Sequence, residues 1–263
     1  MAFVEVDGLR IAYEREGRGR PIVFLHGFFG DHRVWRRQFD LADDYTCIAW
    51  DAPGCGDSST PADSFRLADY TELLAAFIRC LDLDQPHLVG NSFGGTLALQ
   101  LASRHPEIAR SVVGIDTYAG WSGSFTPTVV AERLHASLAD LELSPQDVAG
   151  KWIKGFVTPQ APEPMKDELR SFIADFKPDG MRTMIRSLAE ADLREELKDV
   201  HLPTLLIWGA QDVRSSLAVA NDLEERLEGS RLVVLEDAGH LAQVEAADRV
   251  NAELRAFFKS FEA

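Results

Sequence analysis

The chain has 263 residues, of which 46% are hydrophobic and 26% charged, and this composition excludes a disordered chain. Forty-two acidic residues against 27 basic ones give a formal net charge of −15, which disfavours binding to nucleic acid or to an anionic membrane surface. Three cysteines without a CxxC pair indicate a reducing compartment. There is no signal-peptide pattern and no apolar run of about 18 residues that would span a bilayer. The sequence therefore predicts a soluble, cytoplasmic protein.

Short apolar runs alternate with amphipathic stretches along the first half of the chain. The runs predict strands at 9–13, 21–25, 45–50, 87–90 and 112–115. Continuous apolar runs of this length are typical of strands that are buried on both faces, as in a parallel sheet. Apolar residues at three-and-four spacing predict helices over 65–81 and 92–104, each with one stripe against the sheet.

The alternation stops near residue 120. From there to 185 the sequence offers helical stretches separated by prolines and no strand candidate, and strands return at 204–208 and 232–235 with helices around 217–227 and 246–259. This order predicts an α/β fold with a mostly parallel central sheet and helices on both faces. We expect a core domain formed by residues 1–119 and 186–263. Residues 120–185 are expected to form a helical cap (lid) over the carboxyl ends of the strands, where open sheets bind ligands.

A Gly-x-Ser-x-Gly pattern stands between a predicted strand and a predicted helix, at Gly90, Ser92 and Gly94. A serine on so sharp a strand-to-helix turn needs glycines two positions away on either side, because larger side chains would collide. The helix that follows directs its amino-terminal N–H groups at the turn and favours negative charge there. Ser92 is therefore the candidate nucleophile, and it requires a base.

Seven histidines are available as that base. His240 follows the last predicted strand and precedes the last helix, so it is expected at the carboxyl edge of the sheet. The other histidines stand at the ends of elements or in loops, and we expect surface-like contexts for His32, His135 and His201. His240 is accordingly the candidate general base.

An acid must orient the imidazole and stabilise its charged form. Asp212 follows the predicted strand at 204–208 and precedes His240 by 28 residues, which makes it the preferred candidate. Asp116 directly follows the strand at 112–115 and reaches the same edge of the sheet, so it remains an alternative. Two backbone N–H groups are expected to bind a developing oxyanion: that of Phe93, next to the serine, and that of Phe28 in the glycine-rich loop after the strand at 21–25.

Five segments together resemble the α/β-hydrolase fold superfamily, and the resemblance spans essentially the whole chain. They are 26–30, 51–58, 90–95, 209–212 and 238–240. The resemblance implies a nucleophile–acid–histidine order that maps onto Ser92, Asp212 and His240. Epoxide hydrolases and haloalkane dehalogenases are disfavoured, because they use an aspartate where this chain has Ser92. The segment 90–95 also resembles carbon–carbon bond hydrolases, although those usually carry a smaller oxyanion loop than the Phe28-Phe29 pair.

Aromatic residues supply the candidate substrate pocket, because aromatic side chains at a cleft favour an apolar group. The candidates are Phe29, Trp121, Phe125, Trp152 and Phe156; alternatively, these rings form the cap's own core.

We expect a serine hydrolase that acts on a small, apolar carboxylic ester or lactone through an acyl-enzyme. A carbon–carbon bond hydrolase or perhydrolase with the same triad, and a ligand receptor with vestigial hydrolysis, are the alternatives. No metal-ligand spacing or phosphate-binding loop is present, so no metal or nucleotide cofactor is expected.

Overall fold

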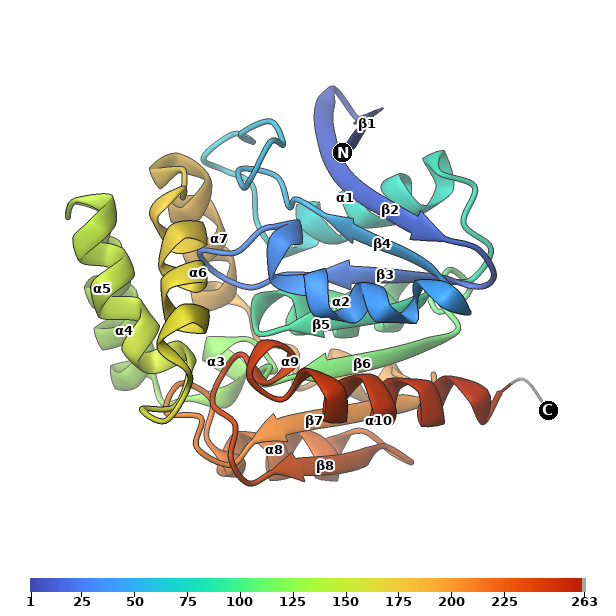
Figure 1. Ribbon diagram of the computed structural model, residues 1–263. Helices are drawn as coiled ribbons and strands as arrows, with labels where there is room; N and C mark the ends of the chain where they lie inside the picture. The colour runs from blue at the N-terminus through green and yellow to red at the C-terminus, as the bar shows by residue number, and fades with distance from the viewer. Residues whose placement is uncertain (262–263) are drawn as a thin grey trace.

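An eight-stranded sheet in the order β1-β2-β4-β3-β5-β6-β7-β8 forms the centre of the protein (Figure 1). The computed structural model describes residues 1–261. The strands are β1 (Ala2–Val6), β2 (Leu9–Gly17), β3 (Pro21–Leu25), β4 (Thr46–Trp50), β5 (His87–Asn91), β6 (Ser111–Ile115), β7 (Thr204–Gly209) and β8 (Arg231–Leu235). All strands from β3 onward pair in parallel, whereas β2 pairs antiparallel with both β1 and β4. The expected mostly parallel sheet is confirmed.

Burial along the strands follows their position in the sheet. The inner strands β4, β5, β6 and β7 are buried at every residue, in agreement with their continuous apolar sequences. The edge strand β1 instead alternates between exposed and partly buried residues along most of its length. Apolar sequence and double-sided burial therefore coincide at the centre of the sheet, which is where the candidate site residues are anchored.

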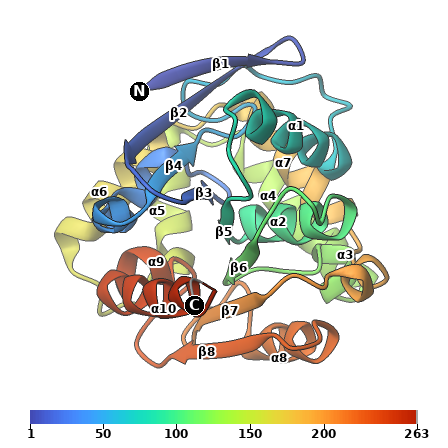
Figure 2. The ribbon, with the colours of Figure 1, turned by 90° about the vertical axis from the view of Figure 1, so that its right-hand side faces the viewer.

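Helices cover both faces of the sheet. Figure 2 shows α1 (Leu67–Cys80), α2 (Phe93–Arg104) and α8 (Leu217–Arg226) on one face, and α9 (Ala242–Glu245) and α10 (Ala247–Lys259) on the other. The helix η1 (His32–Asp43) packs against α9 and α10. Neither η1 nor β1 was predicted from the sequence. None of the helices within residues 1–261 has both the length and the apolar character needed to cross a membrane.

The segment between β6 and β7 is helical. It contains α3 (Trp121–Ser124), α4 (Pro127–Asp140), α5 (Pro145–Phe156), α6 (Glu163–Ala174), α7 (Pro178–Glu190) and η2 (Glu196–Asp199). Helices α4 to α7 each carry a proline at their first or second position, where the missing N–H costs no helical hydrogen bond. Figure 1 shows these four helices together, beside the carboxyl ends of the parallel strands. Helix α7 crosses the domain boundary that we expected at residue 185.

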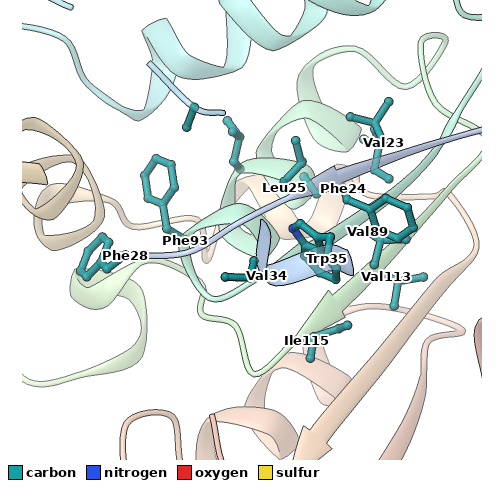
Figure 3. Close-up of a cluster of buried hydrophobic side chains, with 14 of the residues drawn as sticks. Val23, Phe24, Leu25, Phe28, Val34, Trp35, Val89, Phe93, Val113 and Ile115 are labelled. Atoms are coloured by element: carbon teal, nitrogen blue, oxygen red, sulfur yellow. The ribbon is translucent and has the colours of Figure 1, made fainter. Parts of the chain in front are cut away.

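The hydrophobic core extends from the central strands of the sheet to the candidate site. Phe24 of β3 packs on Trp35 of η1 with ring centroids 5.1 Å apart, and both side chains are fully buried. Burial of one such side chain stabilises the fold by about 1.5–3 kcal/mol. Beyond the end of β3 the same cluster continues to Phe28 and Phe93, whose side chains lie beside each other (Figure 3). The core thus fixes the two segments from which the oxyanion donors were expected.

Candidate active site

The turn between β5 and α2 holds Ser92 in a strained conformation, with φ 54° and ψ −117°. A Cβ on Gly90 would come within 2.2 Å of the Gly94 carbonyl oxygen, and a Cβ on Gly94 within 2.0 Å of the Leu25 carbonyl oxygen. These approaches are too close for any side chain. The expectation that this turn needs glycine on both sides of the serine is confirmed.

Hydrogen bonds hold the Ser92 turn against the end of β6. The Ser92 N–H donates to the Ile115 carbonyl at 2.9 Å, and the Ser92 carbonyl accepts from Thr117 Oγ1 at 2.7 Å. Strain of this kind persists only where the surroundings determine the backbone, which is common at functional sites. Only 5% of the Ser92 surface is exposed, so access to its hydroxyl is restricted.

His240 and Asp212 form a buried hydrogen-bonded pair. His240 Nδ1 lies 2.7 Å from Asp212 Oδ2, while Asp212 Oδ1 accepts from the N–H groups of Arg214 at 2.7 Å and Ser215 at 3.1 Å. An ionised carboxylate can only accept, so Nδ1 carries a proton, and in the neutral form of the imidazole Nε2 is then a hydrogen-bond acceptor. This is the tautomer in which an imidazole can take a proton from a hydroxyl.

Asn91 connects this pair to the Ser92 turn. The Asn91 side-chain amide donates to the His240 carbonyl at 3.0 Å, and the His240 imidazole stacks on Phe156 with centroids 5.9 Å apart and planes inclined by 19°. The link is indirect: within residues 1–261, no hydrogen bond joins the Ser92 hydroxyl to His240. The structure thus brings His240 to the residue next to Ser92 and leaves the serine oxygen unbonded.

Asp116, the alternative acid, has other partners. Its Oδ1 accepts from the Gly209 N–H at 2.8 Å and its Oδ2 from the Ala242 N–H at 3.4 Å. Burial, reinforced by the nearby Asp212 carboxylate, raises the pKa of Asp116 well above its usual value. Of the two acids that the sequence left open, Asp212 is the one bonded to His240, whereas Asp116 connects the end of β7 to the start of α9.

The loop after β3 lies directly against the serine. A Cβ on Gly27 would come within 2.9 Å of the Ser92 Cβ. His26 fixes this loop, because its Nε2 accepts from the Ala52 N–H at 2.9 Å while its Nδ1 donates to the Gly27 carbonyl at 2.9 Å. Burial lowers the pKa of His26, which keeps Nε2 available as an acceptor. In the described part of the chain, the N–H groups of Phe28 and Phe93 form no hydrogen bond within the protein.

Four of the five candidate pocket aromatics surround this loop or His240. The Phe28 ring lies 5.8 Å from Trp121 and 6.5 Å from Trp152, and Phe29 lies 4.4 Å from Trp152; Phe156 stacks on His240 as described above. A space of only about 10 Å³ remains beside Phe28 and Phe29, lined also by Phe156 and Asn91 among others. The fifth candidate, Phe125, packs on Tyr118 at 5.8 Å and is partly exposed.

Two residues near the site carry contacts that the sequence did not indicate. Neither Asn91 nor Arg214 was singled out from the sequence. Their partners, His240 for Asn91 and the rings of Trp152 and Phe156 for Arg214, come from distant parts of the sequence. The one local signal is position, since each lies within two residues of a candidate catalytic residue.

The expectation of a surface-like His32 was wrong. His32 Nδ1 lies 2.8 Å from the fully buried Asp51, and the His32 side chain is only 15% exposed. Together with Asp31, these residues place three possible ligand atoms within 4.8 Å of one another. However, protein groups already occupy the carboxylates: Asp51 also accepts from the backbone of His32 and Asp57, and Asp31 pairs with Arg33 at 2.6 Å. The cluster is explained by these internal bonds.

The fold and the site geometry together are those of an alpha/beta hydrolase. Comparison with known proteins agrees, because the model of the alpha/beta hydrolase family matches residues 22–253, and the chain belongs to this family. The chain is 31% identical over 260 residues to the dihydrolipoyllysine-residue acetyltransferase component of the acetoin cleaving system of Cupriavidus necator, covering 96% of this chain and 67% of that protein. It therefore spans about two thirds of the length of that relative.

A shorter relative matches over most of both chains. The 3-oxoadipate enol-lactonase 2 of Acinetobacter baylyi is 29% identical over 250 residues, which cover 92% of this chain and 90% of that protein. Among solved structures, the enol-lactonase from Burkholderia xenovorans LB400 superposes with a TM-score of 0.90 at 22% identity, covering 98% of this chain and all of the other. That structural likeness shows the shared fold.

Proposed function

We propose that the protein is a serine hydrolase that cleaves a small carboxylic ester or lactone through an acyl-enzyme on Ser92. The observation that carries the proposal is the Asp212–His240 hydrogen bond at 2.7 Å, formed beside the strained Ser92 turn. It supplies a correctly protonated base next to a nucleophile that has little activity without one.

The proposed reaction begins with attack of the Ser92 oxygen on the substrate carbonyl. His240 Nε2 takes the serine proton, and the Asp212 carboxylate stabilises the imidazolium that forms. The unbonded N–H groups of Phe28 and Phe93 are the donors for the oxyanion, and each such donor contributes about 10²–10³-fold in kcat in serine hydrolases. His240 then protonates the leaving alcohol and activates water, which releases the acid from Ser92. In a lactone, the leaving alcohol stays attached to the product.

The buried position of Ser92 adds a requirement to this mechanism. The space of about 10 Å³ among the surrounding rings is far smaller than a substrate, because ligand pockets usually measure 300–1,000 Å³. The substrate therefore enters after the rings by which the helical segment 120–185 lines this space, Phe156 and Phe172, move away from Phe28. In this proposal the segment acts as a cap, as expected from the sequence. The lactonase name of the Acinetobacter relative supports lactones as test substrates.

The test combines active-site labelling with turnover. A fluorophosphonate probe located by mass spectrometry is expected on Ser92, and Ser92→Ala is expected to lose labelling and nearly all hydrolysis of a short p-nitrophenyl ester while it keeps its fold. Ser122→Ala is the matched control, because the Ser122 hydroxyl only donates to the Ala189 carbonyl in α7. Full activity of Ser92→Ala contradicts the proposal.

A substrate panel separates the alternatives. Esters and lactones are tested beside a vinylogous diketone, for carbon–carbon hydrolysis, and beside peracid formation from hydrogen peroxide. A single ligand modification without sustained turnover indicates a receptor instead. Sustained hydrolysis of esters or lactones above the other reactions is the result that the proposal requires.

A further inference from the structure

A second pocket, of about 360 Å³, lies between the inserted helices and the loop that follows Asp212. Its lining includes Trp121 of α3, Arg133 of α4, Trp152 of α5 and Arg214 of the loop before α8. Unlike the space beside Phe28, it is large enough to take a small organic group. Its two arginines give it a chemical character that the proposed mechanism does not use.

The guanidinium group of Arg214 has no polar partner. Among residues 1–261 its side chain forms no hydrogen bond and no ion pair, and its Nε is buried without an acceptor. It lies over the ring of Trp152 at 3.7 Å and near that of Phe156 at 4.9 Å. Burial lowers the pKa of Arg214 to about 10, so the group still carries its charge at neutral pH. A buried charged donor left without an acceptor is costly, so Arg214 is able to take an acceptor from outside the protein.

Arg133 brings a second positive charge to the same pocket. Its guanidinium lies over Phe125 at 4.1 Å and near Trp121 at 5.7 Å, and one nitrogen donates to the backbone carbonyl of Arg214 at 2.8 Å. The proximity of Arg133 is one of the causes that lower the pKa of Arg214. No carboxylate pairs with either arginine in the described part of the chain.

Other groups in the pocket add to its excess of positive charge and hydrogen-bond donors. The one carboxylate of its lining, Asp140, already pairs with Lys151 at 2.5 Å and accepts from the Trp152 indole at 2.9 Å. The indole N–H of Trp121, a residue that is 3% exposed, is a further buried donor without an acceptor. The pocket therefore offers several donors and positive charge, and its one carboxylate is already paired.

Arg133 and Arg214 differ in this respect from the other arginines of α4 to α7. Three other arginines of the inserted helices each pair with a carboxylate: Arg170, Arg182 and Arg186. With 42 acidic residues in the chain, an unpaired and partly buried arginine pair stands out. Two like charges close together, neither of them in an ion pair within the described residues, can form a site for an external anion.

The pocket adjoins the candidate active site through shared residues. The Arg214 N–H donates to Asp212, and Phe156, over which Arg214 lies, also stacks on His240. Trp121 and Trp152 line the pocket and also contact Phe28. The pocket and the candidate active site therefore share aromatic residues that contact Phe28 and His240.

We propose that Arg133 and Arg214 bind an anionic group, a carboxylate or a phosphate, at the end of the substrate remote from the bond that is cleaved. This proposal rests on the proposed hydrolase function and refines its substrate class: an apolar ester or lactone body lies among the rings, and one charged end lies in the pocket. The planar guanidinium of Arg214 suits a two-oxygen acceptor.

The kinetic test compares two esters that differ in one charge. Mono-p-nitrophenyl glutarate carries a free carboxylate, and its 4-carbamoylbutanoate counterpart carries an uncharged amide of the same shape. We expect a higher kcat/KM for the carboxylate ester than for the amide ester. The ratio of these two kcat/KM values is expected to fall by about tenfold or more in Arg214→Gln and in Arg133→Gln, mainly because KM for the carboxylate ester rises. Arg214→Lys keeps the charge and is expected to retain part of the ratio. Arg170→Gln, which removes one paired charge from α6, is the control and is expected to leave the ratio unchanged.

Binding measurements separate failure of this proposal from failure of the hydrolase function. In Ser92→Ala, calorimetry with glutarate, methyl phosphate and neutral glutaramide reports the pocket without turnover. Binding of either anion that Arg214→Gln abolishes supports the pocket even if no ester is hydrolysed, and the two anions distinguish a carboxylate from a phosphate. The proposal is overturned if the ratio of the two kcat/KM values is the same in the parent protein and in both arginine variants. It is also overturned if Arg214→Gln lowers kcat/KM for the two esters by the same factor.

Discussion

Replacement of Asp212 by asparagine tests the assignment of the acid most directly. Asp212 Oδ1 accepts from two backbone N–H groups, so the asparagine oxygen is held there and its NH₂ group must face His240. The amide then donates to Nδ1, which forces the imidazole proton onto Nε2, where it blocks abstraction of the Ser92 proton. A wrong tautomer of this kind lowers kcat about 10⁴-fold in a serine protease, roughly 5 kcal/mol of transition-state stabilisation.

The assay is hydrolysis of a short p-nitrophenyl ester at pH 8, with far-ultraviolet circular dichroism to confirm folding. Asp116→Asn is the matched control, because Asp116 is the rival acid. Its asparagine keeps the 2.8 Å bond to the Gly209 N–H and gives up only the 3.4 Å contact with Ala242, so we expect a loss of about tenfold or less. A folded Asp212→Asn variant with more than a tenth of the parent activity, or a larger loss in Asp116→Asn, refutes this reasoning.

Three further predictions concern stability and reactivity. Gly94→Ala is expected to lower the free energy of unfolding, measured by urea denaturation, by more than about 2 kcal/mol because its Cβ would collide with backbone atoms. Gly150→Ala has open space at its Cβ in α5 and is expected to raise the free energy of unfolding by about 0.5–1 kcal/mol. Equal effects of the two substitutions contradict this steric explanation. Burial lowers the pKa of His32, but the hydrogen bond to Asp51 and the charges of Asp51 and Asp31 together outweigh it, so the pKa is raised. The pair therefore stabilises the fold below pH 6.5 and loses this effect as the pH rises through the raised pKa. His32→Gln is expected to lower the free energy of unfolding by about 1–3 kcal/mol at pH 6 and by less at pH 9, and a larger loss at pH 9 contradicts this prediction. Finally, only the exposed thiol of Cys80 is expected to react quickly with Ellman's reagent in the native protein, because the other two cysteines are buried, and all three thiols are expected to react after denaturation. A fast-reacting thiol in native Cys80→Ser contradicts this prediction.

The sequence was sufficient for most of the sheet because its inner strands are apolar throughout. The runs at 21–25 and 204–208 became β3 and β7 with nearly the expected bounds. β1 was missed because an edge strand alternates polar and apolar residues and carries no continuous apolar run. η1 was missed since its buried residues are interspersed with charged ones, and its position depends on contacts with α9 and α10, which lie about 200 residues later in the chain.

The candidate site divides in the same way. Ser92 and its glycines belong to one short segment whose steric requirement is local, so the sequence alone indicated the strained turn. The choice between Asp116 and Asp212 was open, because both follow parallel strands and only side-chain direction separates them. The surroundings of Arg214 were not predictable, since they combine a loop after β7 with aromatic side chains from α5.

On the proposed assignment, the long sequence separation between Asn91 and His240 also limits when hydrolysis can begin during synthesis of the chain. The two residues are 149 positions apart, so a ribosome working at roughly 5–20 residues per second needs about 7–30 s between them. Throughout that interval the nascent polypeptide already carries Ser92 but lacks the His240 imidazole that is proposed to activate it. On the proposed assignment the enzyme is silent while it is being made, and premature termination anywhere before residue 240 yields a catalytically inert fragment.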